Sequence, residues 1–276
     1  MVLAKYLCRY SALILTLCAF SSTSYGKETI TWIEYGLPPV FISSGPHKNQ
    51  GFANQSAKWL QQRMPQWRHV TKLGAIPRFL SMAKTKHLVC SSVLKNAARE
   101  NDLYFSKPLQ SLSPHRLYFL AKNKAVLETK IGHSLSQIIS LEEIMKHLDK
   151  LVFAIAGGRS YGDNRDKILD KYRDQMHIST QYKLSSQFIT RLLADRVDLI
   201  IEYPWIIAYE QTQLNFERDD LASVAIAESA PILEVYIACS KTPAGKAVID
   251  AINQISDAHP ESPLQQFVEQ WNTATN

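Results

Sequence analysis

The stretch Cys90–Pro108 reads Cys-Ser-Ser-Val-Leu-Lys-Asn-Ala-Ala-Arg-Glu-Asn-Asp-Leu-Tyr-Phe-Ser-Lys-Pro. Leu88 and Val89 lead into it as a short strand, and two serines follow. A strand that ends in serines, with the guanidinium of Arg99 farther on, can present hydroxyls and a forked cation to an anionic group. The same stretch also fits a surface arginine in solvent, so by itself it leaves both interpretations open.

Residues 1–26 have the features of a signal peptide. Lys5 and Arg9 form a basic start, an apolar run follows over 12–20, and Ser24-Tyr25-Gly26 places small residues where a signal peptidase cuts. The apolar run is short for a transmembrane helix. Leu17 before Cys18 is too bulky for a lipobox. The expected product is a soluble protein exported to the periplasm and cleaved near Gly26.

Composition describes one globular chain of moderate charge. The formal net charge of +6 falls to +4 once two basic residues leave with the signal peptide. Lys and Arg do not cluster with aromatic residues, so no nucleic-acid partner is predicted. The eight histidines are scattered without a metal-binding spacing, and no phosphate-binding or dinucleotide glycine pattern occurs. No metal and no cofactor are predicted.

Apolar patterning predicts two successive sets of alternating strands and helices. The first set runs from Thr29 to Cys90, the second from His115 to Ile201, and a returning strand covers Ile232–Cys239. This order predicts an α/β protein with two lobes, each a mostly parallel sheet flanked by helices, joined by two hinge crossings around a cleft. The predicted units are 27–112 with 230–276 for lobe 1, and 113–229 for lobe 2. Two capping boxes are predicted, at Ser140 with Glu143 and at Ser160 with Asp163.

The spacing Arg-x5-Phe-Ser-x-Pro over 99–108 resembles the corresponding segment of bacterial extracellular solute-binding proteins of family 3. The order of strands and helices resembles the type II periplasmic binding fold of that family over nearly all of 29–257. The resemblance implies that Arg99 holds a ligand carboxylate and that the Phe-Ser-x-Pro run leads into the first hinge. It also implies that the strands carrying Cys90 and Cys239 are neighbours in one sheet. Both a disulfide between them and two buried free thiols are compatible with that arrangement.

The resemblance extends to the first lobe's ligand-facing residues. Trp32 and Tyr35 lie where the family places an aromatic against the ligand, before Pro38, Pro39 and Phe41. Gly51-Phe52-Ala53-Asn54-Gln55 is similar to the family's Gly-Phe-Asp-x-Asp, but both acids are lost. In the family, two hydroxyl side chains help to hold the ligand carboxylate. Ser92 occupies one of these positions, whereas Leu94 occupies the other and cannot donate a hydrogen bond. Ordinary core packing remains the alternative for the aromatic residues.

The second lobe offers a glycine-rich turn and an acidic strand end. Gly158, Arg159 and Ser160 lie in Gly157–Gly162, where glycines let a ligand approach the backbone and Arg159 adds a cation facing Arg99. Asp198–Pro204 resembles the family strand whose last acid takes the ligand's ammonium. That position falls on Tyr203 and the acid falls on Glu202. Because neighbours along a strand point to opposite faces, only one is expected in the cleft, unless the strand ends there.

A serine hydrolase is the competing interpretation. Gly158–Gly162 spells Gly-x-Ser-x-Gly between a strand and a helix, with Asp198, Glu202 and His259 following in the order of an α/β-hydrolase. No His-Gly oxyanion segment precedes it. The preferred interpretation is a monomeric, non-enzymatic periplasmic protein. It captures a small polar, carboxylate-bearing ligand, an amino acid or a related compound, for an ABC permease or a membrane-bound sensor.

Overall fold

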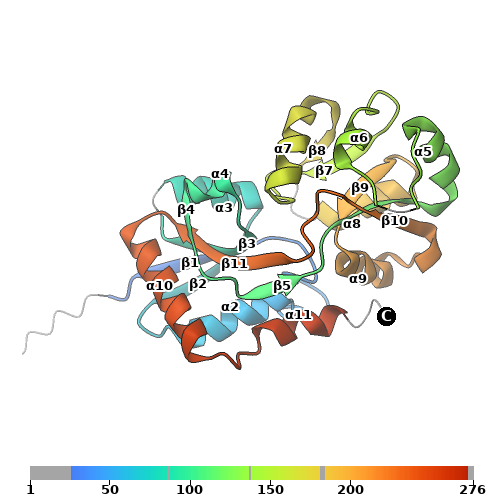
Figure 1. Cartoon of the computed structure of the whole chain (residues 1–276). Helices are drawn as coiled ribbons and strands as arrows, with labels where there is room; N and C mark the ends of the chain where they lie inside the picture. The colour runs from blue at the N-terminus through green and yellow to red at the C-terminus, as the bar shows by residue number, and fades with distance from the viewer. Residues whose placement is uncertain (1–25, 86, 137, 181–183, 273–276) are drawn as a thin grey trace, which may run out of the picture.

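The computed structural model describes residues 26–85, 87–136, 138–180 and 184–272. The predicted signal peptide therefore lies, except for Gly26, outside the described residues. The described chain forms two lobes, each built on one sheet with helices packed against it (Figure 1). None of its helices combines the length and hydropathy needed to cross a bilayer.

Lobe 1 is built on a six-stranded sheet with the order β2-β1-β3-β11-β4, in which β5 also pairs with β11. Strand β1 lies parallel to β2 and β3, whereas β11 runs antiparallel to β3, β4 and β5. The strands span Thr29–Glu34 (β1), Arg68–Leu73 (β2), Val89–Leu94 (β3), Leu103–Phe105 (β4), Gln110–Leu112 (β5) and Leu233–Ser240 (β11).

Lobe 2 is built on a five-stranded sheet with the order β10-β6-β9-β7-β8. Strand β7 lies parallel to β8 and β9, and β6 runs antiparallel to β9 and β10. The strands span Arg116–Leu120 (β6), Phe153–Ala156 (β7), His177–Ser179 (β8), Leu199–Glu202 (β9) and Leu221–Ala225 (β10). Each sheet is thus mixed, with a parallel part completed by antiparallel strands, rather than mostly parallel as predicted.

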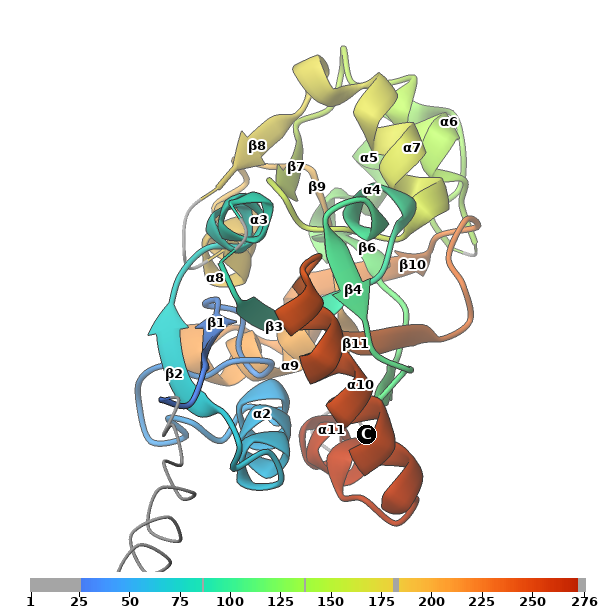
Figure 2. The ribbon, with the colours of Figure 1, turned by 90° about the vertical axis from the view of Figure 1, so that its left-hand side faces the viewer.

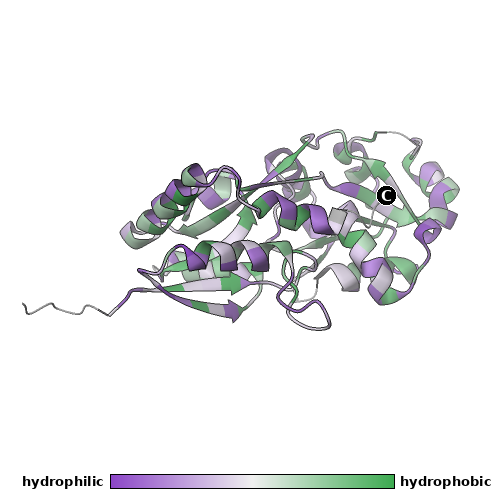
Figure 3. Cartoon of the chain, turned by 90° about the horizontal axis from the view of Figure 1, so that it is seen from below, coloured by the Kyte–Doolittle hydropathy of each residue, from purple (hydrophilic) through white to green (hydrophobic). Residues whose placement is uncertain are grey.

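Helices cover both sheets, and apolar residues of most of them pack in the same clusters as residues of the strands (Figure 3). In lobe 1 they are α2 (Phe52–Gln62), α3 (Ile76–Lys84), α4 (Ala97–Glu100), α10 (Pro243–Ala258) and α11 (Leu264–Asn272). In lobe 2 they are α5 (Lys124–Ile131), α6 (Leu141–Met145), α7 (Asp163–Lys171), α8 (Leu184–Leu193) and α9 (Pro204–Leu214). Three single 3₁₀ turns, at Ala121–Asn123 (η1), Arg173–Gln175 (η2) and Arg218–Asp220 (η3), complete lobe 2.

The chain passes between the lobes twice. It leaves lobe 1 after Leu112 and enters β6 at Arg116, then leaves β10 after Ala225 and re-enters lobe 1 at Leu233. The two crossings begin and end next to each other, because Leu112 pairs with Leu233 in lobe 1 and Arg116 pairs with Ala225 in lobe 2. Two lobes joined by two adjacent crossings confirm the predicted two-lobed α/β fold. They allow the lobes to move as bodies about a common hinge.

Several local predictions were wrong. Helix α6 takes its cap from Glu228, whose carboxylate accepts from the Ser140 hydroxyl (2.6 Å) and the Leu141 amide (2.9 Å), so Glu143 takes no part. Helix α5 and strand β10 were not predicted, because α5 has little amphipathic pattern and β10 is short and built mostly of small residues. Strand β3 does not end at the serines but continues to Leu94, because it is paired along its length with β11.

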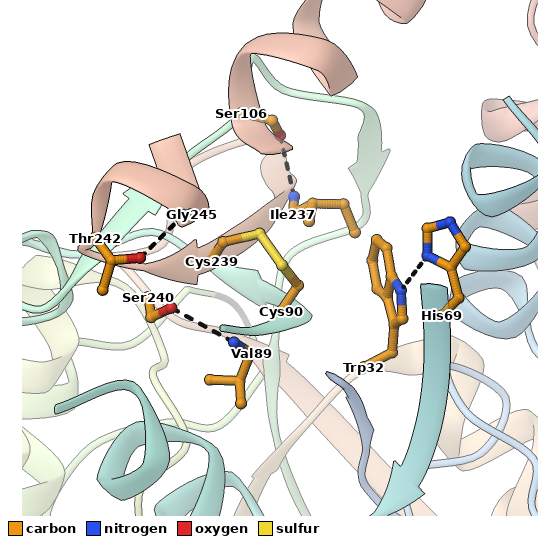
Figure 4. Close-up of a disulfide and its surroundings, with 10 residues drawn as sticks. All are labelled: Trp32, His69, Val89, Cys90, Ser106, Ile237, Cys239, Ser240, Thr242 and Gly245. Atoms are coloured by element: carbon orange, nitrogen blue, oxygen red, sulfur yellow. Dashed lines mark hydrogen bonds between the residues drawn. A yellow bond between two sulfur atoms is a disulfide. The ribbon is translucent and has the colours of Figure 1, made fainter. Parts of the chain in front are cut away.

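A disulfide joins Cys90 of β3 to Cys239 of β11, with an S–S distance of 2.04 Å (Figure 4). The two residues face each other in the antiparallel register of these strands. Trp32 lies in the same apolar cluster and donates its indole N–H to His69 Nδ1 over 3.1 Å. The sheet thus holds the two halves of lobe 1, which are distant in sequence, through both backbone pairing and a covalent bond.

Candidate functional site

A small cavity between the lobes brings together residues from both. Its volume is about 40 Å³. Five of the predicted ligand-binding residues line it, namely Tyr35, Arg99, Arg159, Ser160 and Tyr203. The remaining lining is apolar and consists of Leu37, Ile76, Val93 and Leu94. The predicted convergence of the two arginines at one gap between the lobes is therefore present in the structure.

Arg99 connects the lobes directly. It lies on the short helix α4 with a relative exposure of 7%. One terminal nitrogen donates to the carbonyl of Leu94 in its own lobe (2.7 Å), and the other donates to the carbonyl of Gly158 in lobe 2 (2.8 Å). Burial lowers the pKa of Arg99, and the neighbouring Tyr35 and Asp166 oppose that shift. The guanidinium is thus bonded to neutral carbonyl oxygens in a buried place.

Helix α4 is also attached to the start of α7 across the cleft. The Asn96 amide donates to Asp166 Oδ2 (3.1 Å), and the Ala97 backbone N–H donates to Asp163 Oδ1 (3.2 Å). Asn96 caps α4 as well, because its side-chain oxygen accepts from the Arg99 backbone N–H (2.9 Å). The helix that presents Arg99 is consequently held in place by acids of the opposite lobe. Figure 2 shows α4 lying beside α7.

Arg159 is not the free second cation that the sequence suggested. It forms a two-pronged ion pair with Glu202, with N–O distances of 2.9 and 2.6 Å, and the two side chains are 5% and 1% exposed. Burial alone would lower the pKa of Arg159, but the adjacent Glu202 outweighs burial and raises that pKa. Strand β9 ends at Glu202, which does not line the cavity, whereas Tyr203, the next residue, lines it.

Ser160 is held by an acid of α7. Its hydroxyl donates to Asp166 Oδ2 (2.6 Å), and the other oxygen of Asp166 accepts from the Tyr161 amide (2.7 Å). The predicted capping box of Ser160 with Asp163 is wrong, because α7 begins only at Asp163 and Gly162 takes the cap position.

The hydrolase interpretation fails on the same geometry. The hydroxyl of Ser160 donates to Asp166 rather than to a histidine. His259 ends α10 in lobe 1, where it packs on Trp59 and contacts Glu261. Asp198 accepts from the Val152 amide at the start of β7 (2.7 Å), which is a structural role. Ser160, His259 and Asp198 are therefore not joined as a catalytic triad requires.

Aromatic rings stack behind the cavity from the hinge to lobe 1. Tyr203 stacks on His115 with ring centroids 3.8 Å apart and on Trp205 at 4.4 Å, and Trp205 meets Phe52 of α2 edge-on at 5.4 Å. His115, in the first hinge crossing, is 1% exposed, and neither ring nitrogen has a hydrogen-bond partner. Burial and the positive charges of Arg159 and Arg165 lower the pKa of His115 well below 6.5.

Three predicted residues have other surroundings. Trp32 faces the core of lobe 1 on the opposite side of β1 from Tyr35, so the structure separates it from the cavity. The backbone carbonyl of Ser92 accepts from the Tyr35 hydroxyl (2.6 Å). Gly158 offers its carbonyl to Arg99 rather than an N–H group to the cavity.

Sequence reasoning missed Asn96, His115 and Asp166. Asn96 had a usable signal, since Asn before Ala-Ala-Arg-Glu is a typical helix start. His115 and Asp166 carried no signal, because their roles depend on contacts with the other elements around the cleft. The described residues contain no group of three or more His, Cys, Asp or Glu side chains placed to hold a metal ion.

No protein-family model and no curated protein matches the chain. Solved structures do match. An amino acid ABC transporter substrate-binding protein from Streptococcus pneumoniae, bound to L-arginine, is 16% identical with a TM-score of 0.64, covering 90% of this chain and 96% of its own. A histidine kinase sensor domain with similarity to periplasmic binding proteins is 11% identical with a TM-score of 0.64, covering 90% and 94%.

A third similar structure is an ancestral amino-acid-binding protein described as a precursor of cyclohexadienyl dehydratase. It is 13% identical with a TM-score of 0.61, covering 89% of this chain and 95% of its own. At such identities the likeness establishes the fold, which is the two-lobed fold of periplasmic binding proteins. The match spans nearly the whole of each neighbour.

Proposed function

We propose that this protein is an exported, non-enzymatic solute-binding protein that captures a small carboxylate-bearing molecule between its lobes. The observation that supports it most is the position of Arg99. A buried guanidinium from lobe 1 reaches lobe 2 at the edge of a cavity that both lobes line. The two N–H donors of a guanidinium bind a carboxylate more strongly than they bind carbonyl groups, because hydrogen bonds between charged groups are stronger.

The lobes must separate before a ligand can enter. A cavity of about 40 Å³ has room for only a few water molecules. In the proposed cycle the lobes part, the ligand displaces the Arg99 contact with Gly158, and contacts made by both lobes select the closed form. The residues proposed to contact the ligand are Tyr35, Arg99, Ser160 and Tyr203, with Ser92, Gly158, Arg159 and Glu202 positioning them.

The proposed place of action is the periplasm, and the proposed partner is an ABC permease or a membrane-bound sensor. The similar structures include both a transporter component and a kinase sensor domain. A pull-down from membranes with the purified protein, followed by identification of an integral membrane protein of one class, would separate the two.

A thermal-shift screen over small carboxylic acids and amino acids tests the binding proposal. A ligand at a hundred times its Kd adds about 2.7 kcal/mol to the free energy of unfolding. We expect Arg99→Ala to abolish the largest shift, and the exposed Arg218→Ala to keep it. An Arg99→Ala protein that retains the full shift would remove Arg99 from the site. A screen with no shift from any compound would contradict the binding proposal.

A further inference from the structure

We infer that the cleft selects an organic acid that carries no ammonium group, and so discriminates against amino acids. The inference rests on the proposed function and narrows its ligand class. It is carried by the pairing of Glu202 with Arg159, which engages the carboxylate of Glu202 before any ligand arrives.

Every acceptor position of Glu202 is occupied. Oε1 accepts from Arg159 Nη2 (2.6 Å) and from the Tyr203 backbone N–H (2.9 Å). Oε2 accepts from Arg159 Nη1 (2.9 Å) and from the Ser185 hydroxyl (2.7 Å). A carboxylate offers about four lone-pair sites, so a ligand ammonium would have to displace one of these donors. Displacing Arg159 would leave a buried cation unpaired, which is costly.

The other nearby acid is similarly engaged. Asp166 accepts from the Ser160 hydroxyl (2.6 Å), the Tyr161 amide (2.7 Å) and Asn96 of lobe 1 (3.1 Å). It does not line the small cavity. Neither Glu202 nor Asp166 therefore offers a free acceptor to an ammonium placed in the cavity.

The charge around the cavity favours an anion. Among the described residues, its lining contains the guanidiniums of Arg99 and Arg159 and no carboxylate. A third guanidinium, that of Arg165, is 1% exposed and donates to the backbone carbonyls of Tyr161 and Glu228. Because Glu202 offsets the charge of Arg159, the lining cation that acts on a ligand is Arg99, whose guanidinium is bonded to neutral carbonyl groups. Arg99 would attract a carboxylate and repel an ammonium.

The remaining lining suits a short apolar skeleton. Tyr35 and Tyr203 contribute aromatic walls, and Leu37, Ile76 and Val93 contribute aliphatic ones. The hydroxyl of Tyr35 is already donated to the Ser92 carbonyl. An acid with an aliphatic or aromatic skeleton would thus pair its carboxylate with Arg99 and rest its apolar part against these walls.

Matched ligand pairs test the inference by isothermal titration. Phenylalanine is compared with 3-phenylpropionate, and leucine with 4-methylpentanoate, so that only the ammonium differs. We expect the deaminated acid of at least one pair to bind at least tenfold more tightly than its amino acid. Amino acids that bind as tightly as their partners would overturn the inference and leave the proposed function standing. A protein that binds neither these compounds nor any carboxylic acid in a wider screen would overturn both.

Two variants locate the discrimination at the ion pair. Arg159→Met frees the Glu202 carboxylate, and we expect the preference for the deaminated acid to fall at least tenfold. Arg159→Met with Glu202→Gln removes both charges, and we expect it to keep the preference. A far-ultraviolet circular dichroism spectrum matching the wild type establishes that each variant is folded. If Arg159→Met is folded and keeps the full preference for the deaminated acid, the ion pair of Arg159 with Glu202 does not cause the discrimination. If Arg159→Met does not fold, the ligand comparison on the wild type still tests the inference.

Discussion

His115 is a single residue whose surroundings tie the stability of this protein to pH. The ring stacks on Tyr203, lies 5.2 Å from Tyr161 and is subject to the positive charges of Arg159 and Arg165. Both ring nitrogens are buried without hydrogen-bond partners. A protonated imidazole would therefore be disfavoured in the folded protein, and the neutral ring is the form that packs in the hinge.

We predict that the free energy of unfolding falls as pH drops below 6.5, because the unfolded chain then takes up a proton that folded His115 refuses. On going from pH 7.5 to pH 5.5, His115 should lower the free energy of unfolding by about 1.4 kcal/mol. His115→Phe keeps the stacked ring and should remove that part of the pH dependence in urea unfolding. Parallel pH profiles for the two proteins would contradict the prediction, since the other histidines contribute equally to both.

At the scale of elements, helix α3 of lobe 1 lies against the turn after β7 of lobe 2. Gly158 has a φ of +77°, and a Cβ on it would lie 3.0 Å from Cγ and 3.2 Å from Cδ of Pro77. Gly132, after α5, has a similar φ of +74° but no atom within 4 Å of such a Cβ. The two glycines share the same backbone requirement and differ in whether another lobe lies against them.

We predict that Gly158→Ala and Gly132→Ala each lower the free energy of unfolding by about 1 kcal/mol, because alanine is strained at positive φ. Only Gly158→Ala should also weaken binding of the best carboxylic acid, by about tenfold, because its methyl group holds Pro77 and the lobes apart. Titration calorimetry on the two variants gives the comparison. Equal ligand affinities would show that this turn does not limit closure.

At the scale of the whole molecule, the chain is arranged as one lobe inserted into another. The disulfide between Cys90 and Cys239 joins residues separated by 149 positions, and all of lobe 2 lies within that loop. Cross-linking a loop of this length restricts the unfolded chain strongly, which stabilises the folded form.

We predict that Cys90→Ala with Cys239→Ala lowers the free energy of unfolding of lobe 1 by about 2–5 kcal/mol. Urea unfolding followed by tryptophan fluorescence would measure it, since Trp32 packs in the same cluster as the disulfide. Dithiothreitol should destabilise the wild type by a similar amount and leave the double variant unaffected. If the variant unfolds at the wild-type urea midpoint, the bond contributes nothing to folding.

The sequence by itself determined the alternation of strands and helices, the two lobes and the residues that lead to the cleft. These follow from local patterns, such as the apolar strand Val89–Cys90 before Arg99 and the glycines after Phe153–Ala156. The mixed character of the sheets, helix α5 and the cap on α6 did not follow, because pairing partners and Glu228 come from distant parts of the chain.

Only the tertiary structure decided the charge of the site. A sequence shows that Arg159 and Glu202 exist, but their bidentate contact depends on β7 and β9 lying side by side and ending together. The same holds for Arg99, whose partner Gly158 belongs to the other lobe. The interaction between two charges depends on their distance in space and on their burial, and not on their separation along the chain. Packing therefore decides whether the carboxylate of Glu202 is free to bind a ligand ammonium or is neutralised by Arg159.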